Sequence, residues 1–222
     1  MAAQQYENRR DGGRALAGHI AANAPDLKGK ALILGLPRGG VPVAREVAEA
    51  LACPFDTLLV KKLGVPGHEE LAFGALSEYG ALAINESVTQ SGGLDAGTIE
   101  GIRLDAQREL EQRAQRYRGG REPPAIEGRA CVLVDDGLAT GATMRAAVQA
   151  ARAAGAKSVD VAVPVAPPEA AKDLEGVSDR FLCPMTPAGF MAVGAWYRDF
   201  SQTTDDEVRA LLAESGASRS KE

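Results

Sequence analysis

The sequence predicts an α/β domain with a mostly parallel sheet flanked by helices. Two observations lead to this fold class. Apolar runs of strand length alternate with segments whose apolar residues recur every three or four positions. Several of the runs end directly in Gly, Pro or Asp, residues that close strands. Because 222 residues suit one domain with an embellishment, we expect a single domain over 1–222 with its core at about 30–185.

The first part of the chain alternates between helix and strand patterns. Leu16 and Ile20 lie four positions apart and predict a helix over 9–22, with Asp11 as its cap. The run ALILGL at 31–36 is closed by Pro37 and predicts a buried strand. The segment 41–51 follows at helical spacing.

The next segments predict a strand and a hairpin. FDTLLVKKLG at 55–64 is the second expected strand. Residues 63–71 hold two glycines and a proline, and we expect a mobile loop there. AFGAL and ALAINE flank SEYG at 77–80, which predicts a hairpin.

Residues 98–118 form the longest segment of helical spacing, and the linker GGREPP follows at 119–124. One face of this predicted helix is apolar. The opposite face mixes Arg103 and Arg108 with acidic residues, so we interpret it as a solvated, ion-paired surface. The remaining pattern predicts strands at 130–136, 158–166 and 179–185 and helices at 140–155, 167–176 and 204–214. A C-terminal segment, 186–222, lies beyond the expected core.

Composition excludes several classes of protein. The 45% hydrophobic and 25% charged residues are those of a globular domain. No apolar run is long enough to span a membrane, and no apolar signal segment precedes the fold. The three cysteines lie far apart, which fits a reducing cytoplasm. The net charge of −5 argues against nucleic-acid binding. Two histidines exclude a three-histidine metal site, and the HExxH, GxSxG, GxGxxG and Walker motifs are absent.

The most informative segment is CVLVDDGLATGAT at 131–143. Asp135 and Asp136 end an apolar strand at the edge where open α/β sheets bind ligands. A loop of small residues then leads into a helix, where backbone N–H groups and the hydroxyls of Thr140 and Thr143 can hold a phosphate. This arrangement suits a sugar phosphate. The alternative is a plain strand-to-helix turn with a threonine cap, but such a turn needs no pair of carboxylates that are costly to desolvate.

VLVDDGLATGAT resembles the phosphoribosyl-pyrophosphate (PRPP) signature of the type I phosphoribosyltransferases. The resemblance covers roughly residues 30–166 and implies that family's fold, with a small hood built from the chain ends or from the inserted helix 98–121. It implies that Asp135 and Asp136 hold the ribose hydroxyls, and Mg²⁺ indirectly through PRPP. The 5-phosphate would be enclosed by Ala139, Thr140, Gly141, Ala142 and Thr143.

A second segment, LGLPRGG at 34–40, matches the family's pyrophosphate loop, which often holds a cis peptide. Gly39 and Gly40 allow a ligand to approach the backbone closely, and Arg38 supplies a permanent positive charge. As a motif on its own, this pattern is also that of an ordinary turn. Arg38-Gly39 has the form found in adenine phosphoribosyltransferases.

The third segment holds Lys61, Lys62 and the pair Glu78-Tyr79. Adjacent lysines at a strand end are usually solvated, but the resemblance implies contact with pyrophosphate. SEYG resembles the hairpin of the adenine enzymes, which makes Glu78 a candidate for proton handling. An ordinary role in the hairpin turn is the alternative for Glu78.

The acceptor base is less defined. Hypoxanthine and guanine enzymes carry Asp where this chain has Ala139, which disfavours a 6-oxopurine. The adenine enzymes have only a brief connection in place of 98–121, and their N-terminal base-binding segment has no counterpart in this chain. Phe190 and Trp196 could stack on a base, or could pack on the core. As a whole, the chain is most similar to a bacterial subgroup predicted to be phosphoribosyltransferases.

We therefore expect a cytoplasmic, homodimeric phosphoribosyltransferase that uses PRPP and Mg²⁺ to ribosylate a nitrogenous, purine-like base and to release pyrophosphate. Asp135, Asp136, Glu78 and Lys62 are the expected catalytic residues. Arg38 and Lys61 would stabilise the pyrophosphate charge together with Lys62. The alternative is a non-catalytic regulator that binds PRPP or nucleotides. A general α/β hydrolase lacks its nucleophile motif in this sequence.

Overall fold

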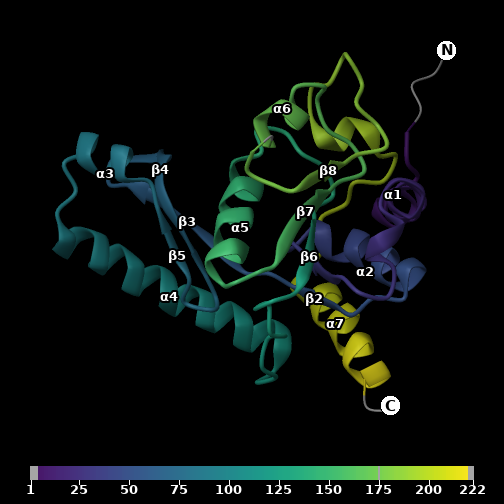
Figure 1. The fold of residues 1–222 in the computed structure, drawn as a ribbon, viewed down its shortest axis with the longest axis horizontal. Helices are drawn as coiled ribbons and strands as arrows, with labels where there is room; N and C mark the ends of the chain where they lie inside the picture. The colour runs from purple at the N-terminus through teal and green to yellow at the C-terminus, as the bar shows by residue number, and fades with distance from the viewer. Residues whose placement is uncertain (1–4, 175, 220–222) are drawn as a thin grey trace.

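Five parallel strands in the order β2-β1-β6-β7-β8 form the central sheet of the protein (Figure 1). This computed structural model describes residues 5–174 and 176–219, so residues 1–4, 175 and 220–222 of the expected domain lie outside the described part. The strands are β1 (Leu32–Gly35), β2 (Phe55–Thr57), β6 (Ala130–Val134), β7 (Ser158–Ala162) and β8 (Arg180–Leu182). The predicted α/β class with a mostly parallel sheet is confirmed.

Helices cover both faces of this sheet. One face is covered by α5 (Ala142–Ala153) and the short α6 (Ala170–Leu174), and the other by α1 (Arg9–Asn23), α2 (Gly40–Leu51) and α7 (Asp205–Arg219). Short 3₁₀ turns lie at Pro25–Leu27 and Val193–Trp196. Among the described residues, no helix has both the length and the apolar composition that a membrane crossing requires.

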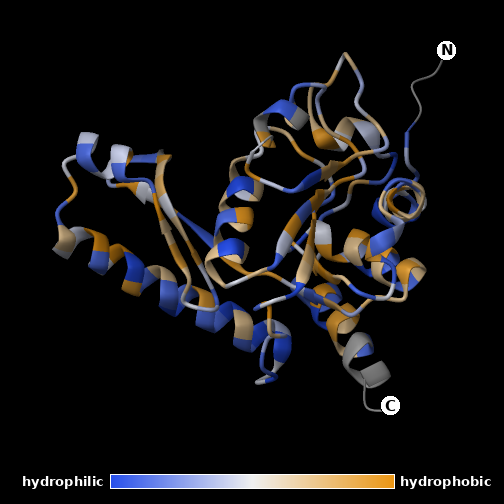
Figure 2. Cartoon of the chain, in the orientation of Figure 1, coloured by the Kyte–Doolittle hydropathy of each residue, from blue (hydrophilic) through white to orange (hydrophobic). Residues whose placement is uncertain are grey.

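The strands are apolar throughout because both faces are buried. Leu32 and Leu34 of β1 pack in the core beneath α5, whereas Ile33 packs in the core beneath α1 and α2. The strand β6 divides its residues between the two cores in the same way. Figure 2 shows the resulting band of apolar residues along the central strands, with polar residues on the outer helix surfaces. Continuous apolar runs are typical of parallel strands that are covered on both faces.

A second, antiparallel sheet extends from the central one in Figure 1. It contains β3 (Val60–Val65), β4 (His68–Ser77) and β5 (Leu82–Ile84), and is followed by α3 (Glu86–Ser91) and the long α4 (Ala96–Arg118). Phe73 and Leu76 of β4 share an apolar core with Leu110 of α4. The expected inserted helix therefore packs along this sheet. Its solvated face is confirmed, since Arg103 pairs with Glu100 and Arg108 with Asp105.

The structure corrects the prediction of one strand over 55–64. Residues 55–57 pair with β1 in the central sheet, whereas Val60 begins the second sheet opposite Ser77. Leu58 and Leu59, between them, bury their side chains in different cores. A continuous apolar run does not show that its first and last residues pair with strands of different sheets. The sequence pattern therefore predicted a single strand.

The prediction of a mobile loop at 63–71 is also wrong. These residues form the hairpin of β3 and β4, which turns at Pro66 and Gly67, where Gly67 has a φ of 76°. Leu63 and Val65 bury alternate side chains and hold the first strand in place. The predicted hairpin around SEYG is confirmed as the turn between β4 and β5.

Two predicted helix starts differ from the structure. Asn8, and not Asp11, caps α1, because its side chain accepts the N–H of Asp11 at 3.1 Å. The helix expected from 140 begins at Ala142, since Gly141 has a φ of 68° and lies outside helical geometry.

The two ends of the described chain meet beside the carboxyl edge of the central sheet. The backbone of Tyr6 donates to the carbonyl of Trp196 at 2.9 Å and accepts from the N–H of Arg198 at 2.9 Å. Tyr6 and Tyr197 pack against Val165, which follows β7. The hood was expected to come from the chain ends or from the inserted helix 98–121. Of these two, the chain ends are the part that lies beside the carboxyl edge of the central sheet.

A buried ion pair network joins the second sheet and α4 to the central sheet. Arg118, the last residue of α4, donates to Asp56 of β2 at 2.9 Å, to the carbonyl of Thr57 at 2.7 Å and to both carboxylate oxygens of Glu78. The side chains of Arg118, Asp56 and Glu78 are 1%, 4% and 3% exposed. One guanidinium thus neutralises two buried carboxylates from two sheets.

Replacing this guanidinium should be far more costly than replacing a surface arginine. Arg118→Met leaves two buried carboxylates unpaired and should lower the free energy of unfolding by about 3–5 kcal/mol. Arg108→Met, which removes an exposed ion pair in the same helix, should lower it by less than about 0.5 kcal/mol. Urea unfolding followed by circular dichroism measures both, and equal losses would contradict the assigned role of Arg118.

Candidate active site

The candidate site lies where β1 and β6 end side by side. These strands pair in parallel with Gly35 opposite Val134, so the segments that follow them leave the sheet at the same edge. The segment after β1 contains Arg38, Gly39 and Gly40, and the segment after β6 begins with Asp135 and Asp136. Two of the three segments singled out in the sequence are thus brought together.

The contact between these segments leaves no room for side chains at two positions. A β-carbon on Gly39 would lie 2.1 Å from Oδ2 of Asp136, and one on Gly40 would lie 2.4 Å from the carbonyl oxygen of Val134. A cis peptide bond joins Pro37 to Arg38, in agreement with the cis peptide that the resemblance implies for this loop. The guanidinium of Arg38 lies 3.8 Å from a carboxylate oxygen of Asp205 at the start of α7.

Asp135 and Asp136 are partly buried and close to each other. Oδ1 of Asp135 accepts the N–H of Asp136 at 2.9 Å, and Oδ2 of Asp136 accepts Nε of Arg9 at 2.7 Å. Burial raises the pKa of both carboxyl groups, and the charge of Asp136 raises the pKa of Asp135 further. The hydrogen bond from Arg9 acts in the opposite direction on the pKa of Asp136. The pair is a set of hydrogen-bond acceptors, and within the described residues Arg9 is the cation that forms an ion pair with it.

Two helices begin next to the carboxylates, α2 in direct contact with them and α5 six positions after Asp136 in the chain. The helix α2 follows Gly39 and α5 follows Gly141, and neither glycine can supply a side chain to cap the first turn. Thr140 and Thr143 are exposed at the start of α5. A helix N-terminus presents N–H groups and partial positive charge, which favour anions. The site therefore combines two helix N-termini suited to anions with a pair of carboxylate acceptors.

The lysines lie on a different part of the fold. Lys61 and Lys62 belong to β3 of the second sheet. The ammonium of Lys61 pairs with Glu109 of α4 at 2.6 Å. The structure therefore directs Lys61 toward α4, and a contact with pyrophosphate would require it to leave Glu109.

The surroundings of Glu78 favour the alternative given for it, an ordinary structural role in the hairpin, over proton handling. Both carboxylate oxygens accept from Arg118, and one also accepts the N–H of Leu59 at 2.9 Å. Burial raises the pKa of Glu78, although Arg118 opposes the rise. The neighbouring Tyr79 donates its hydroxyl to the carbonyl of Pro124 at 2.8 Å. We assign Glu78 a structural role, because its acceptor positions are committed to the protein itself.

Phe190 and Trp196 pack on the aromatic cluster of the chain ends. Both contact the group formed by Tyr6, Val165 and Tyr197. The hydroxyl of Tyr197 donates to the backbone carbonyl of Asp136, so this cluster borders the acidic pair. Base stacking by Phe190 and Trp196 stays a prediction.

Sequence reasoning missed Arg9 and Tyr197, which both contact Asp136. They lie 127 and 61 positions away from it in the chain. Arg9 falls in a run of polar residues at the start of a surface helix, a place where arginine is ordinary. No local pattern marks either residue, because only the meeting of the two chain ends brings them to the site.

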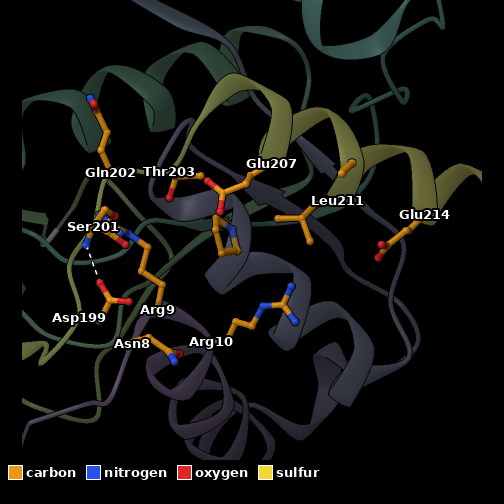
Figure 3. Close-up of a pocket in the computed structure, with 12 residues that line it drawn as sticks. Asn8, Arg9, Arg10, Asp199, Ser201, Gln202, Thr203, Glu207, Leu211 and Glu214 are labelled. Carbon is orange, nitrogen blue, oxygen red and sulfur yellow. Dashed lines mark hydrogen bonds between the residues drawn. The ribbon is translucent and has the colours of Figure 1, made fainter.

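A pocket of about 320 Å³ opens on the outer side of Arg9 (Figure 3). Arg10, Glu207 and Leu211 line it, together with Pro42 of α2. Among the described lining residues are none of the site residues expected from sequence. Arg9 is the residue that both lines this pocket and contacts the acidic pair.

Comparisons with known proteins agree with this geometry. A family model described as a phosphoribosyl transferase domain matches residues 4–190. Two curated proteins from Mycobacterium tuberculosis strains CDC 1551 and H37Rv, whose names propose a phosphoribosyl transferase, are each 49% identical over 208 residues. The match covers 93% of this chain and 46% of each relative, so the chain spans about half their length.

A solved structure is similar over nearly the whole chain. The crystal structure of TT1426 from Thermus thermophilus has a TM-score of 0.86 and 41% sequence identity. The alignment covers 95% of this chain and 99% of that chain. The second sheet and the long helix α4 therefore belong to an arrangement that another protein shares.

A methyl group at position 39 should disturb the site without straining the backbone. Gly39 has a φ of −62° and a ψ of −33°, which any residue adopts. Gly39→Ala should therefore lower the free energy of unfolding by about 1–3 kcal/mol through its clash with Asp136. Gly18→Ala in α1, where nothing lies within 4 Å, should instead raise it by up to about 1 kcal/mol. If chemical denaturation finds Gly39→Ala as stable as the wild type, the close contact is wrong.

Removing the charge of Asp135 should stabilise the unliganded fold in a pH-dependent way. Folding favours the protonated carboxyl, so the wild type loses stability as pH rises from about 4, the value in an unfolded chain, through the raised pKa. Asp135→Asn is neutral throughout and should be more stable by at least about 1 kcal/mol at pH 8, with convergence near pH 4. Melting curves across this range measure the difference. Asp105→Asn, at an exposed site, should show little such trend, and the same trend in both variants would refute burial of Asp135 as the cause.

Proposed function

The chain belongs to the phosphoribosyl transferase family, and we propose that it uses PRPP with Mg²⁺ to ribosylate a nitrogenous, purine-like base, with release of pyrophosphate. The observation that carries this proposal is the acidic pair Asp135 and Asp136 in contact with the start of α2 and followed in the chain by the start of α5, two helix N-termini that no side chain caps. PRPP has the matching chemistry, because a diol lies between a 5-phosphate and a pyrophosphate. Its two anionic ends and its hydroxyls match the two kinds of group in the site.

Each end of PRPP has a proposed position. The 5-phosphate would bind at 139–143, against the first N–H groups of α5 and the hydroxyl of Thr143. The ribose hydroxyls would donate to Asp135 and Asp136. The pyrophosphate would lie along Arg38–Gly40, at the N-terminus of α2. The glycines at 39 and 40 keep this backbone close to the carboxylates, which a shared sugar requires.

The donor set fits Mg²⁺ only together with PRPP. Carboxylate oxygens are ligands that Mg²⁺ accepts, and Asp135 and Asp136 would face it through the bound sugar. In the described part of the chain, no group of three acidic, histidine or cysteine residues could hold a metal by itself. Bound with PRPP, the ion would supply positive charge to the pyrophosphate group.

The chain's own charges suit a reaction in which the sugar becomes positive and the leaving group negative. Asp135 and Asp136 lie where the sugar would develop positive charge, and Arg38 and the N-terminus of α2 lie where pyrophosphate would leave. Lys61 and Lys62 are further proposed pyrophosphate contacts, on the condition that Lys61 exchanges Glu109 for the ligand. Glu78 no longer takes part in this proposal.

The choice of base now depends on fewer residues. The resemblance to adenine enzymes used Arg38-Gly39, Glu78-Tyr79 and Ala139, and the buried contacts of Glu78 and Tyr79 remove the second of these. Ala139 still disfavours a 6-oxopurine. We therefore propose a purine-like acceptor, with adenine tested first.

Binding of Mg-PRPP measured by calorimetry tests the site. Wild-type protein should bind, and Thr143→Ala should bind at least about tenfold more weakly, because a hydrogen bond to a charged group contributes about 1.5–3 kcal/mol. Thr98→Ala, at an exposed position in α4, is the matched control and should bind as the wild type does. Equal affinity for all three proteins would contradict the proposed binding of the 5-phosphate at 139–143.

Pyrophosphate release with adenine, hypoxanthine, guanine and non-purine heterocycles then separates a transferase from a regulator. Release with one of these bases supports the transferase. Tight binding of Mg-PRPP without release with any base supports the non-catalytic regulator. A wild-type protein that does not bind Mg-PRPP would contradict both.

A further inference from the structure

Arg9 lies at a point where the N-terminal helix, the C-terminal segment and the acidic pair meet. Its Nε donates to Oδ2 of Asp136 at 2.7 Å, and its Nη1 donates to the carbonyl of Ser201 at 2.6 Å. The guanidinium carbon lies 4.0 Å from the centre of the Phe200 ring. Resting on the proposed function, we propose that Arg9 is a positioning residue that holds Asp136 ready to accept the ribose hydroxyls.

The guanidinium of Arg9 is fixed on several sides. The Arg9 side chain is only 12% exposed, although it begins a surface helix. A carboxylate, a backbone carbonyl and an aromatic face each hold it, which leaves it little rotational freedom. A guanidinium held in this way fixes the carboxylate that accepts from it, because the geometry of an arginine–carboxylate contact is directional.

Asp136 is consequently held at two atoms by the chain ends. Its Oδ2 accepts from Arg9, and its backbone carbonyl accepts from the hydroxyl of Tyr197. The ring of Tyr197 in turn stacks on Phe200 at 5.1 Å between centres. Arg9 and Tyr197 therefore constrain both the backbone and the side chain of Asp136, and its Oδ1 is left to meet a ligand.

Arg9 acts through Asp136 and not on the pyrophosphate. Two of its three nitrogens donate to Asp136 and to Ser201. Arg9 borders the 37–40 loop, since a β-carbon on Gly39 would lie 3.3 Å from its Nε, but this nitrogen is committed to Asp136. The side chain also lines the outer pocket of Figure 3, whose described lining residues include none of the 37–40 loop. Loss of Arg9 should therefore weaken ligands that carry the ribose diol and spare ligands that lack it.

Three ligands separate these effects. Calorimetry with Mg-PRPP, with ribose 5-phosphate and with magnesium pyrophosphate would be carried out on the wild type, Arg9→Gln, Arg9→Lys and Arg10→Gln. Arg10 is the matched control, because it is the next residue, is exposed, and points into the outer pocket. Thermal melting of each variant shows that it is folded at the temperature of the titration.

Arg9→Gln should bind Mg-PRPP and ribose 5-phosphate at least about tenfold more weakly, with pyrophosphate affinity within about twofold of the wild type. Arg9→Lys keeps a charge beside Asp136 and should recover part of the lost affinity. It also keeps the proposal testable if Arg9→Gln does not fold. Arg10→Gln should match the wild type for all three ligands.

The contrary outcomes are distinct. Unchanged ribose 5-phosphate affinity in Arg9→Gln would overturn the positioning role while leaving the proposed function intact. Equal weakening of all three ligands, or weakening of pyrophosphate alone, would also overturn it, because Arg9 would then act generally or directly on the anion. Failure of the wild type to bind Mg-PRPP would defeat the proposed function itself.

Discussion

The close approach of two loops at the carboxyl ends of β1 and β6 is the constraint on which the candidate site depends. Parallel pairing of these strands brings the backbone at 39–40 so near to Asp135 and Asp136 that only glycine fits. The same pairing fixes the starts of α2 and α5, because each helix follows its strand after a short loop. The carboxylates after β6 and the start of α2 after β1 therefore lie together, although these segments are far apart in the sequence.

The protein treats its buried carboxylates in two different ways. Asp56 and Glu78 are deeply buried, but Arg118 donates to both of them, so they stabilise the junction between the sheets. The carboxylate of Asp136 accepts from Arg9 and that of Asp135 accepts the N–H of Asp136, and burial raises the pKa of both. Acceptors that are incompletely satisfied by the protein cost stability, and these two are the ones that we propose bind PRPP.

The sequence was sufficient to predict the parts of the candidate site whose residues are contiguous in the chain. The strand, carboxylates, loop and helix of 131–143 are contiguous, so their arrangement could be predicted from local rules. The division of 55–64 between two sheets could not, because strand partners are set by tertiary packing. The ion pair of Glu78 could not be predicted because its partner, Arg118, is 40 positions away, and Arg9 was missed because the chain ends meet only in the fold.

A structure determined with Mg²⁺ and PRPP tests the central claim most directly. We expect the ribose hydroxyls on Asp135 and Asp136, the 5-phosphate at 139–143 against the start of α5, and the pyrophosphate along 38–40. A ligand bound elsewhere, for example in the pocket lined by Arg10 and Glu207, would contradict this claim, since the two helix N-termini would then have no part in binding.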